Sequence, residues 1–218
     1  MDLILIEGLE LSCIVGVRPF ERRRPQPIRL DLTLGLDLSA AGRTGRIAHT
    51  CDYDRVAEEV RAILRFREYQ LIEMATEELA AMLFAVHRAL VQVEIRLDKP
   101  AALHGHAHSA GVRVRRQREQ FDAAPEPRPF GTVVPLMESS EAGLYLVNIA
   151  PGKRLSPPAG HSLRVLQWVV SGELYDGEQP WGPSDPIGPP GLGLRAHDNV
   201  GAQDASLFCC TTPAWSRR

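Results

Sequence analysis

The sequence predicts an α+β fold: an antiparallel sheet with two helices on one face in the N-terminal half, and an all-β C-terminal half. Three observations predict it. Apolar residues recur at every second position in four segments of the first 117 residues, a period typical of strands with one buried face. Between the second and third segments the spacing becomes that of amphipathic helices. After residue 121 the apolar runs are short and proline is frequent, which favours strands joined by turns.

The predicted elements follow one another in a simple order. Apolar residues alternate from Leu9 to Val15, and residues 28–38 are apolar at every even position. Two helices come next, and Thr50 or Asp52 can cap the first. Their apolar faces comprise Val56, Val60, Ile63 and Leu64, and then Leu71, Ala75, Leu79, Met82 and Val86. The last strand pair is marked by Val91, Val93, Ile95 and Leu97, and then by Val112 and Val114.

This order of strand, strand, helix, helix, strand, strand leaves a sheet with two open edges. Such edges invite pairing with another copy of the chain. A change of composition then divides the sequence, since only four of its seventeen prolines lie in residues 1–121. We expect a first domain over 1–121, a proline-rich linker over 122–131 and a second domain over 132–218.

Charge and hydropathy exclude some classes of protein. The net charge of −2 argues against a general nucleic-acid binder. We find no basic leader followed by an apolar stretch and no segment long enough to span a membrane, so we expect a cytoplasmic protein without a membrane partner. The four cysteines lack CxxC or zinc-finger spacing, and we expect them to be reduced thiols.

Lysine is rare in this chain. It has two lysines, Lys99 and Lys153, against twenty-three arginines. Arginine stays protonated, whereas a partly desolvated lysine can lose its proton and act as a base. Two lysines could survive by chance, but Lys99 is a candidate for acid–base chemistry.

Four polar residues lie in phrases that suit them to chemistry: Glu21 in GVRPFERRRPQ, Tyr53 in HTCDYDRV, Glu73 in QLIE and Lys99 in RLDKP. Taken singly, they are a turn carboxylate, a packing residue, a helix N-terminal acid and a strand-end charge. As an ordered set, with IEGLEL…GV and LDLSAAGRTGRIAHTCDYDRVAEEV, they resemble the dihydroneopterin aldolase family over residues 2–117. The resemblance therefore favours an active-site role for the four residues over these plainer interpretations. It implies the tunnelling fold, with subunits joined edge to edge as a homotetramer or homo-octamer and active sites between subunits.

The resemblance also implies a reaction and a set of roles. The family cleaves 7,8-dihydroneopterin into 6-hydroxymethyl-7,8-dihydropterin and glycolaldehyde in folate biosynthesis, and the C=N group of the pterin is the electron sink, so neither cofactor nor metal is implied. Lys99 would be the base and Tyr53 would return a proton to the enol carbon. Glu21 would orient Lys99 or the substrate hydroxyls, supported by Gln26. The implied substrate-binding residues are Glu73, Gln26, Asp52, Leu71 and Ile72, with Glu73 on the amidine-like edge of the pterin.

Two departures from the family leave alternatives open. The turn before Glu21 reads Arg18-Pro19-Phe20, and PAALHGHAHSAGV follows Lys99 where KPGA is commoner. That tail also resembles dihydroneopterin triphosphate 2'-epimerase, and Arg18 and Arg22–Arg24 could hold phosphates. A non-catalytic pterin-binding or regulatory protein is a further alternative.

The run His104-Gly105-His106-Ala107-His108 invites a metal site, because alternate histidines on a strand project to one side. A polar hairpin turn before the last strand is the favoured interpretation.

The second domain has short apolar runs, and the phrases NIAPGKRLSPPAGHSLRVLQWVVSGEL and GPPGLGLRAHDN resemble the two halves of a cupin motif. The resemblance puts Ala159, His161, Val165 and Leu194 at the four ligand positions of metal-binding cupins, with His197 three residues past the last. One histidine cannot hold a catalytic metal, so we expect a degenerate, metal-free cupin-like domain. It could bind a small ligand, cover an edge of the assembly or dimerise.

Other residues of this domain have plainer interpretations. Trp168, Trp181 and Trp215 are expected in core and rim packing, and Cys209 and Cys210 as buried neighbours in one strand, although a redox switch is an alternative for the two cysteines.

Overall fold

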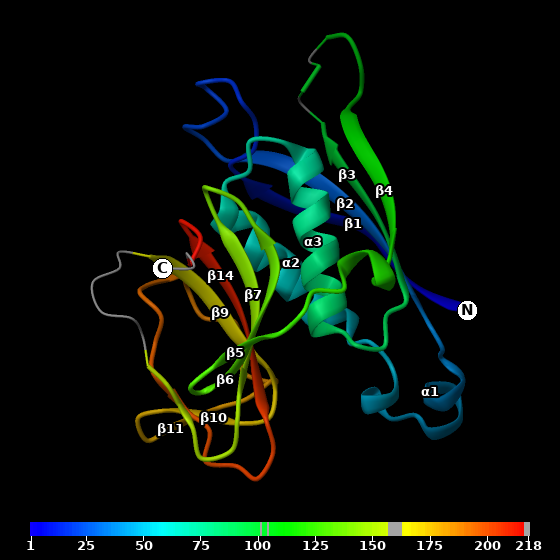
Figure 1. Cartoon of the computed structure of the whole chain (residues 1–218). Coiled ribbons are helices and arrows are strands. Elements are labelled where there is room, and N and C mark those ends of the chain that lie inside the picture. Colours follow the sequence, from blue (N-terminus) through cyan, green and yellow to red (C-terminus); the bar gives the residue numbers. More distant parts are fainter. Residues whose placement is uncertain (101, 104, 157–162, 216–218) are drawn as a thin grey trace. The chain divides into compact units, whose positions relative to one another are not determined.

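A computed structural model describes the chain except for residues 101, 104, 157–162 and 216–218. The chain forms two compact units, Met1–Asp122 and Ala123–Arg218 (Figure 1). The predicted fold class is confirmed: the first unit is an antiparallel sheet with two helices, and the second is all-β. Within the described parts of the chain, no helix has the length and apolar character needed to cross a membrane.

The first unit is built on a sheet with strand order β1-β2-β3-β4. The strands are β1 (Asp2–Cys13), β2 (Gln26–Leu36), β3 (Gln92–Lys99) and β4 (Ala110–Gln117). In β2 the apolar residues at even positions are all buried, which confirms the predicted alternation. In β1 the pairing with β2 shifts between Ile6 and Leu9, a bulge at which Gly8 adopts φ 68° and donates its N–H to Asp31. Beyond the bulge the odd positions are buried, as predicted from Leu9 onward.

Helices α2 (Tyr53–Arg67) and α3 (Ile72–Val86) cover one face of this sheet, α2 in contact with β1 and α3 with β3 and β4 (Figure 1). Asp52 caps α2, because its carboxylate accepts the backbone N–H groups of Asp54 and Arg55. Leu71 was expected on the buried face of the second helix, but it precedes α3 and is 51% exposed.

Three short helices were not predicted: α1 (Ser39–Thr44), η1 (Ile47–His49) and η2 (Arg118–Phe121). None of them contains a buried residue. Their sequences therefore carry no apolar period from which a helix could be predicted.

The second unit consists of two antiparallel sheets. The larger has the order β12-β9-β14-β7-β6-β5, and the smaller β11-β10-β13-β8. The larger sheet contains β5 (Glu126–Arg128), β6 (Gly131–Glu138), β7 (Gly143–Ile149), β9 (Arg164–Ser171), β12 (Gly191–Leu192) and β14 (Ala205–Thr212). The smaller contains β8 (Arg154–Leu155), β10 (Leu174–Asp176), β11 (Gln179–Trp181) and β13 (His197–Asp198). Part of the segment expected as a linker thus forms β5.

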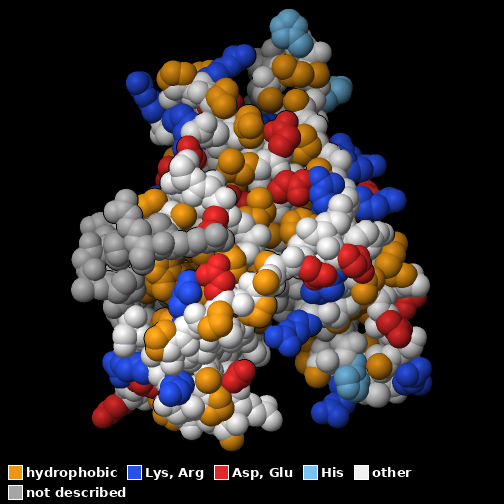
Figure 2. Space-filling model, in the orientation of Figure 1, with side chains coloured by type: hydrophobic (Ala, Val, Ile, Leu, Met, Phe, Trp, Pro, Cys, Tyr) orange, Lys and Arg blue, Asp and Glu red, His pale blue; other side chains and the backbone are white. Residues whose placement is uncertain are grey.

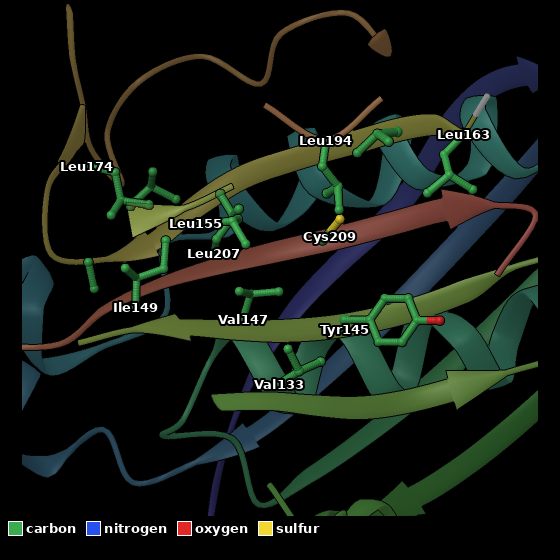
Figure 3. Close-up of a cluster of buried hydrophobic side chains, with 13 residues drawn as sticks. Val133, Tyr145, Val147, Ile149, Leu155, Leu163, Leu174, Leu194, Leu207 and Cys209 are labelled. Carbon is green, nitrogen blue, oxygen red and sulfur yellow. The ribbon is translucent and has the colours of Figure 1, made fainter. Parts of the chain in front are cut away.

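A cluster of thirteen buried residues forms the core of the second unit (Figure 3). Trp181 and Trp215 pack against it, and Trp168 is buried with its ring 4.3 Å from that of Phe208, so the expected packing of the tryptophans is confirmed. Cys209 and Cys210 are buried neighbours on β14, also as expected. The cluster comprises Val133, Tyr145, Val147, Ile149, Leu155, Leu163, Val165, Val169, Leu174, Leu194, Ala205, Leu207 and Cys209.

Two of the cupin ligand positions, Val165 and Leu194, belong to this apolar core. The other two, Ala159 and His161, lie outside the described residues. On the face drawn in Figure 2, acidic and basic side chains are interspersed, in keeping with the small net charge.

A buried polar cluster joins the two helices of the first unit. His87, which follows α3, lies 2.7 Å through Nε2 from Glu59 Oε2 of α2, and its Nδ1 lies 3.5 Å from the sulfur of Cys51. Burial alone would lower the pKa of His87, but the hydrogen bonds to Cys51 and Glu59 and the Glu59 charge raise it from 6.5 to about 10. His87 is therefore charged at neutral pH and neutralises the Glu59 carboxylate, which is almost fully buried.

The His87–Glu59 pair should make the first unit less stable at alkaline pH. Because the folded pKa is raised, the stabilisation is fully present below 6.5 and is lost as pH rises through about 10. We expect His87→Gln to cost on the order of 2 kcal/mol near neutral pH and progressively less toward pH 10. Urea unfolding of both proteins, followed by NMR signals of the first unit, measures this difference, and a difference independent of pH would contradict the assignment.

Candidate active site

Lys99, the last residue of β3, lies largely withdrawn from water, with 9% of its surface exposed. Its Nζ donates to Glu21 Oε1 at 2.6 Å and to the Val15 carbonyl at 3.2 Å. An ammonium in such surroundings needs both a charge partner and hydrogen-bond acceptors. The structure supplies both at one end of the sheet.

The loop from Val15 to Gln26 brings Glu21 to Lys99. Glu21 binds Lys99 through Oε1, and its second carboxylate oxygen, Oε2, accepts the Arg18 backbone N–H at 2.9 Å. Burial would raise the pKa of Glu21, but the hydrogen bond from Lys99, that from Arg18 and the positive charges of both lower it below its ordinary value. Glu21 is therefore ionised at neutral pH, and the two side chains form an ion pair.

Gly16 makes room for the Glu21 carboxylate. Its φ of 134° is one that residues with a side chain rarely adopt, and a Cβ there would overlap the carboxylate group. The position therefore requires glycine for its backbone conformation and for the space that it leaves to Glu21.

Gln26 shares an acceptor with Lys99. Its amide Nε2 donates to the Val15 carbonyl, the oxygen that also receives a hydrogen bond from Lys99. The structure thus brings together three of the residues singled out from the sequence: Glu21, Gln26 and Lys99.

The same loop is fastened to the connection between α2 and α3. The Tyr69 carbonyl accepts the Gly16 N–H and Arg22 Nη1, each at 3.0 Å. The Tyr69 hydroxyl donates to Glu78 at 2.7 Å, and Glu78 pairs with Arg67, also at 2.7 Å. This buried cluster fixes the backbone three residues before α3. It therefore sets the start of that helix relative to the loop from Val15 to Gln26.

The other predicted residues lie at the N-termini of the two helices. Tyr53 is the first residue of α2 and is 58% exposed, next to Asp52, whose carboxylate caps the helix. Glu73 is exposed in the first turn of α3, after Leu71 and Ile72. In the described parts of this single chain, no hydrogen bond or ion pair joins Tyr53 or Glu73 to Lys99 or Glu21.

A cavity of about 850 Å³ opens beside Glu21 and Gln26. That volume is in the range of sites for small organic ligands. Arg18, Arg23 and Arg24 line it, together with Pro19, Phe20, Glu21, Pro25, Gln26 and Ala102. The candidate site is therefore an ion pair at the edge of a hollow with several cationic groups.

The histidine run lies where the favoured interpretation placed it, between β3 and β4. His106 and His108 are exposed in this turn, and His104 lies outside the described residues. Among the residues that are described, no three histidine, cysteine or acidic side chains gather as they would around a metal ion.

Sequence reasoning missed the parts of the site that act through the backbone. These are the carbonyl groups of Val15 and Tyr69 and the space above Gly16. Gly16 can be seen in the sequence, in the phrase GV at the start of the loop. A backbone carbonyl acceptor cannot be predicted in this way, because every residue type has one.

Comparison with known proteins finds relatives of the N-terminal half of the chain. The profile of the dihydroneopterin aldolase (FolB) family matches residues 4–115. The dihydroneopterin aldolase of Methylorubrum extorquens is 32% identical over 58% of this chain and 98% of its own length. The crystal structure of Escherichia coli dihydroneopterin aldolase in complex with neopterin matches with a TM-score of 0.51 and 29% identity, over 53% of this chain and 99% of that one.

Structural neighbours that cover the C-terminal part come from the cupin superfamily. One is the cupin domain of an XRE family transcriptional regulator from Enterobacter cloacae, at 21% identity and a TM-score of 0.28, over 39% of this chain and 96% of that one.

Replacing Gly16 tests the packing of this site. Gly16→Ala should destabilise the first unit by on the order of 2 kcal/mol, because the methyl group displaces Glu21 and the backbone is strained. Gly45→Ala is the matched control, since Gly45 also has positive φ but open space around a Cβ, and we expect about 1 kcal/mol there. Urea unfolding followed by NMR signals of the first unit compares them, and equal losses would show that Gly16 makes no room for Glu21.

Proposed function

The chain belongs to the dihydroneopterin aldolase family, and from that premise we propose that it is a lyase that cleaves 7,8-dihydroneopterin into 6-hydroxymethyl-7,8-dihydropterin and glycolaldehyde. The observation that carries the proposal is the Lys99–Glu21 ion pair beside the cavity. The comparisons favour neither the triphosphate 2'-epimerase nor a non-catalytic pterin-binding protein.

The first chemical step is removal of a proton from a hydroxyl of the substrate side chain. Lys99 accepts this proton, directly or through a water, in its neutral form, which it reaches when its ammonium proton passes to the Glu21 carboxylate. Glu21 and the Val15 carbonyl hold Nζ in place for the transfer, and Gln26 holds the same carbonyl. Proton transfer of this kind needs a donor and acceptor at hydrogen-bonding distance, which a fixed side chain provides.

Carbon–carbon cleavage follows, with the electrons of the broken bond taken up by the C=N group of the pterin. Glycolaldehyde leaves as the hydroxyl oxygen becomes its carbonyl, and an enol remains on the pterin. Tyr53 delivers a proton to the enol carbon and so forms the hydroxymethyl group. The proton that Lys99 took up then passes through water to the Tyr53 oxygen, and the proton held on Glu21 returns to Lys99. The enzyme is thereby restored, and the reaction needs no external oxidant or reductant.

Recognition of the pterin is the role of the start of α3. The exposed carboxylate of Glu73 can accept two hydrogen bonds from the amidine-like edge of the ring. Leu71 and Ile72 bring backbone groups and apolar surface to the same place. Asp52 contributes by fixing the N-terminus of α2, on which Tyr53 stands.

The active site is completed by a second copy of the chain. Tyr53 is exposed and makes no hydrogen bond to Lys99 in the described part of one chain. The sheet has β1 and β4 as its two edges, and β1 carries Leu3 and Leu5 exposed on one side. Edge-to-edge association would cover these strands and form a homotetramer or homo-octamer with sites between neighbouring subunits.

The two lysines of the chain provide a matched test of the chemistry. Lys99→Met should lower kcat for 7,8-dihydroneopterin by roughly 10²–10⁴-fold, because the base is lost. Lys153→Met removes the other lysine, in the second unit, and should leave kcat unchanged. Chromatography of 6-hydroxymethyl-7,8-dihydropterin measures both, and a Lys99→Met enzyme with normal turnover would refute the proposed base.

Mixing two inactive variants tests whether sites are shared. Lys99→Met and Tyr53→Phe should each be inactive alone. If each site takes Lys99 from one subunit and Tyr53 from its neighbour, co-expression should restore about a quarter of wild-type activity, since random mixing leaves that share of sites intact. Mixtures that remain inactive, although mass spectrometry shows hetero-oligomers, would place both residues in the same subunit.

A further inference from the structure

The interior of the second unit contains a polar row within an apolar core. Strands β9 and β14 pair so that Val165, Gln167 and Val169 lie opposite Thr211, Cys209 and Leu207. The valines, Leu207 and Cys209 belong to the core cluster, so alternation along each strand turns Gln167 and Thr211 toward the same interior. Two polar side chains therefore interrupt an inner face that is otherwise apolar.

His197 meets this row from the smaller sheet. It is fully buried on β13, and its Nε2 lies 2.9 Å from Gln167 Nε2. The amide nitrogen can only donate, so Nε2 accepts and the ring carries its proton on Nδ1. Burial lowers the pKa of His197 to about 4, which keeps the ring neutral at ordinary pH.

Three buried polar atoms at this place lack partners. Among the described residues, Gln167 Oε1, His197 Nδ1 and Thr211 Oγ1 make no hydrogen bond. Each such atom destabilises the fold when it is left without a hydrogen bond. They include a donor at His197 and an acceptor at Gln167, so a molecule that offers both an acceptor and a donor would satisfy them.

A small pocket adjoins Gln167, the one of these three residues that belongs to its described lining. Its described lining includes Gln167, Trp181 and Arg195, with Val165 and a glycine-rich wall of Gly188, Pro189, Gly191 and Gly193. The Trp181 ring also lies 5.2 Å from that of His197. The volume is about 40 Å³, whereas a single water needs roughly 10–15 Å³, so the pocket suits a ligand of only a few non-hydrogen atoms.

The charge of the pocket selects the ligand further. Arg195 contributes a cation, and none of the described lining residues is acidic. Arg195 Nη1 lies 3.6 Å from Asp176 Oδ2, and both side chains are exposed, so this ion pair is weak. A guanidinium at the pocket favours a carboxylate, which it can bind through two hydrogen bonds.

We propose that the second unit binds a small 2-hydroxycarboxylate, such as glycolate or lactate, in this pocket. The carboxylate pairs with Arg195, the hydroxyl donates to Gln167 Oε1, and His197 accepts from the Gln167 amide and so holds it in place. Trp181 covers the ligand. The site uses no metal ligand of the cupin pattern, since Val165 and Leu194 fill two of those positions with apolar side chains.

Calorimetric titration of the full-length protein tests this proposal with four probes: glycolate, lactate, acetate, which lacks the hydroxyl, and ethylene glycol, which lacks the carboxylate. We expect saturable binding of glycolate or lactate, at least tenfold tighter than that of acetate or ethylene glycol. Arg195→Gln and Gln167→Leu should each weaken it at least tenfold. Arg154→Gln should not, because Arg154 on β8 is a similarly exposed arginine that pairs with Asp198 and is absent from the described lining of the pocket.

Three results would overturn the site: no saturable binding of any probe, as for a pocket that holds only water; equal affinity for all four; or unchanged affinity in Arg195→Gln. Gln167 is half-buried, so the fold of the Gln167→Leu variant is checked by circular dichroism. If that variant fails to fold, Arg195→Gln, an exposed position, decides alone.

Discussion

The ion pair between Lys99 and Glu21 is the interaction on which the first unit's site depends. Both groups are largely removed from water, so each needs the other and further hydrogen bonds. Val15 supplies a carbonyl to Lys99, Arg18 supplies an N–H to Glu21, and Gly16 leaves the space that the carboxylate occupies. A buried ion pair adds little net stability compared with apolar residues of similar volume. Its presence at the rim of a cavity is better explained by proton transfer.

Much of the first unit follows from its sequence because burial there has a clear period. The even positions of β2 and the apolar face of α2 are buried as predicted, as are Ala75, Leu79 and Met82 of α3, whereas Val86 is only half-buried. The prediction for Leu71 was wrong, because a residue that fits the apolar period of a helix can still precede the helix and remain half-exposed. The short helices α1 and η1 bury nothing and so left no signal. In the site, Glu21, Gln26 and Lys99 were found through the resemblance of the ordered set to the family, whereas Tyr69 acts through a carbonyl that any residue would provide.

The second unit was harder to predict, and the reason is physical. Short apolar runs between prolines indicate strands, but they do not say which strands pair. The polar interior arises because β13, only two residues long, pairs with β10 and β8 and so brings His197 to Gln167 of the opposite sheet. No local pattern records such a contact. The histidine therefore stood in the sequence only as a residue out of register with a metal-binding motif.

The central claim is that this chain breaks a carbon–carbon bond through an enol that is protonated by the enzyme. Cleavage of 7,8-dihydroneopterin in D₂O by the wild-type protein tests it most directly, with the product examined by mass spectrometry and proton NMR. We expect 6-hydroxymethyl-7,8-dihydropterin with a single deuterium on the hydroxymethyl carbon. Product without deuterium at that carbon, or no product at all, would contradict it.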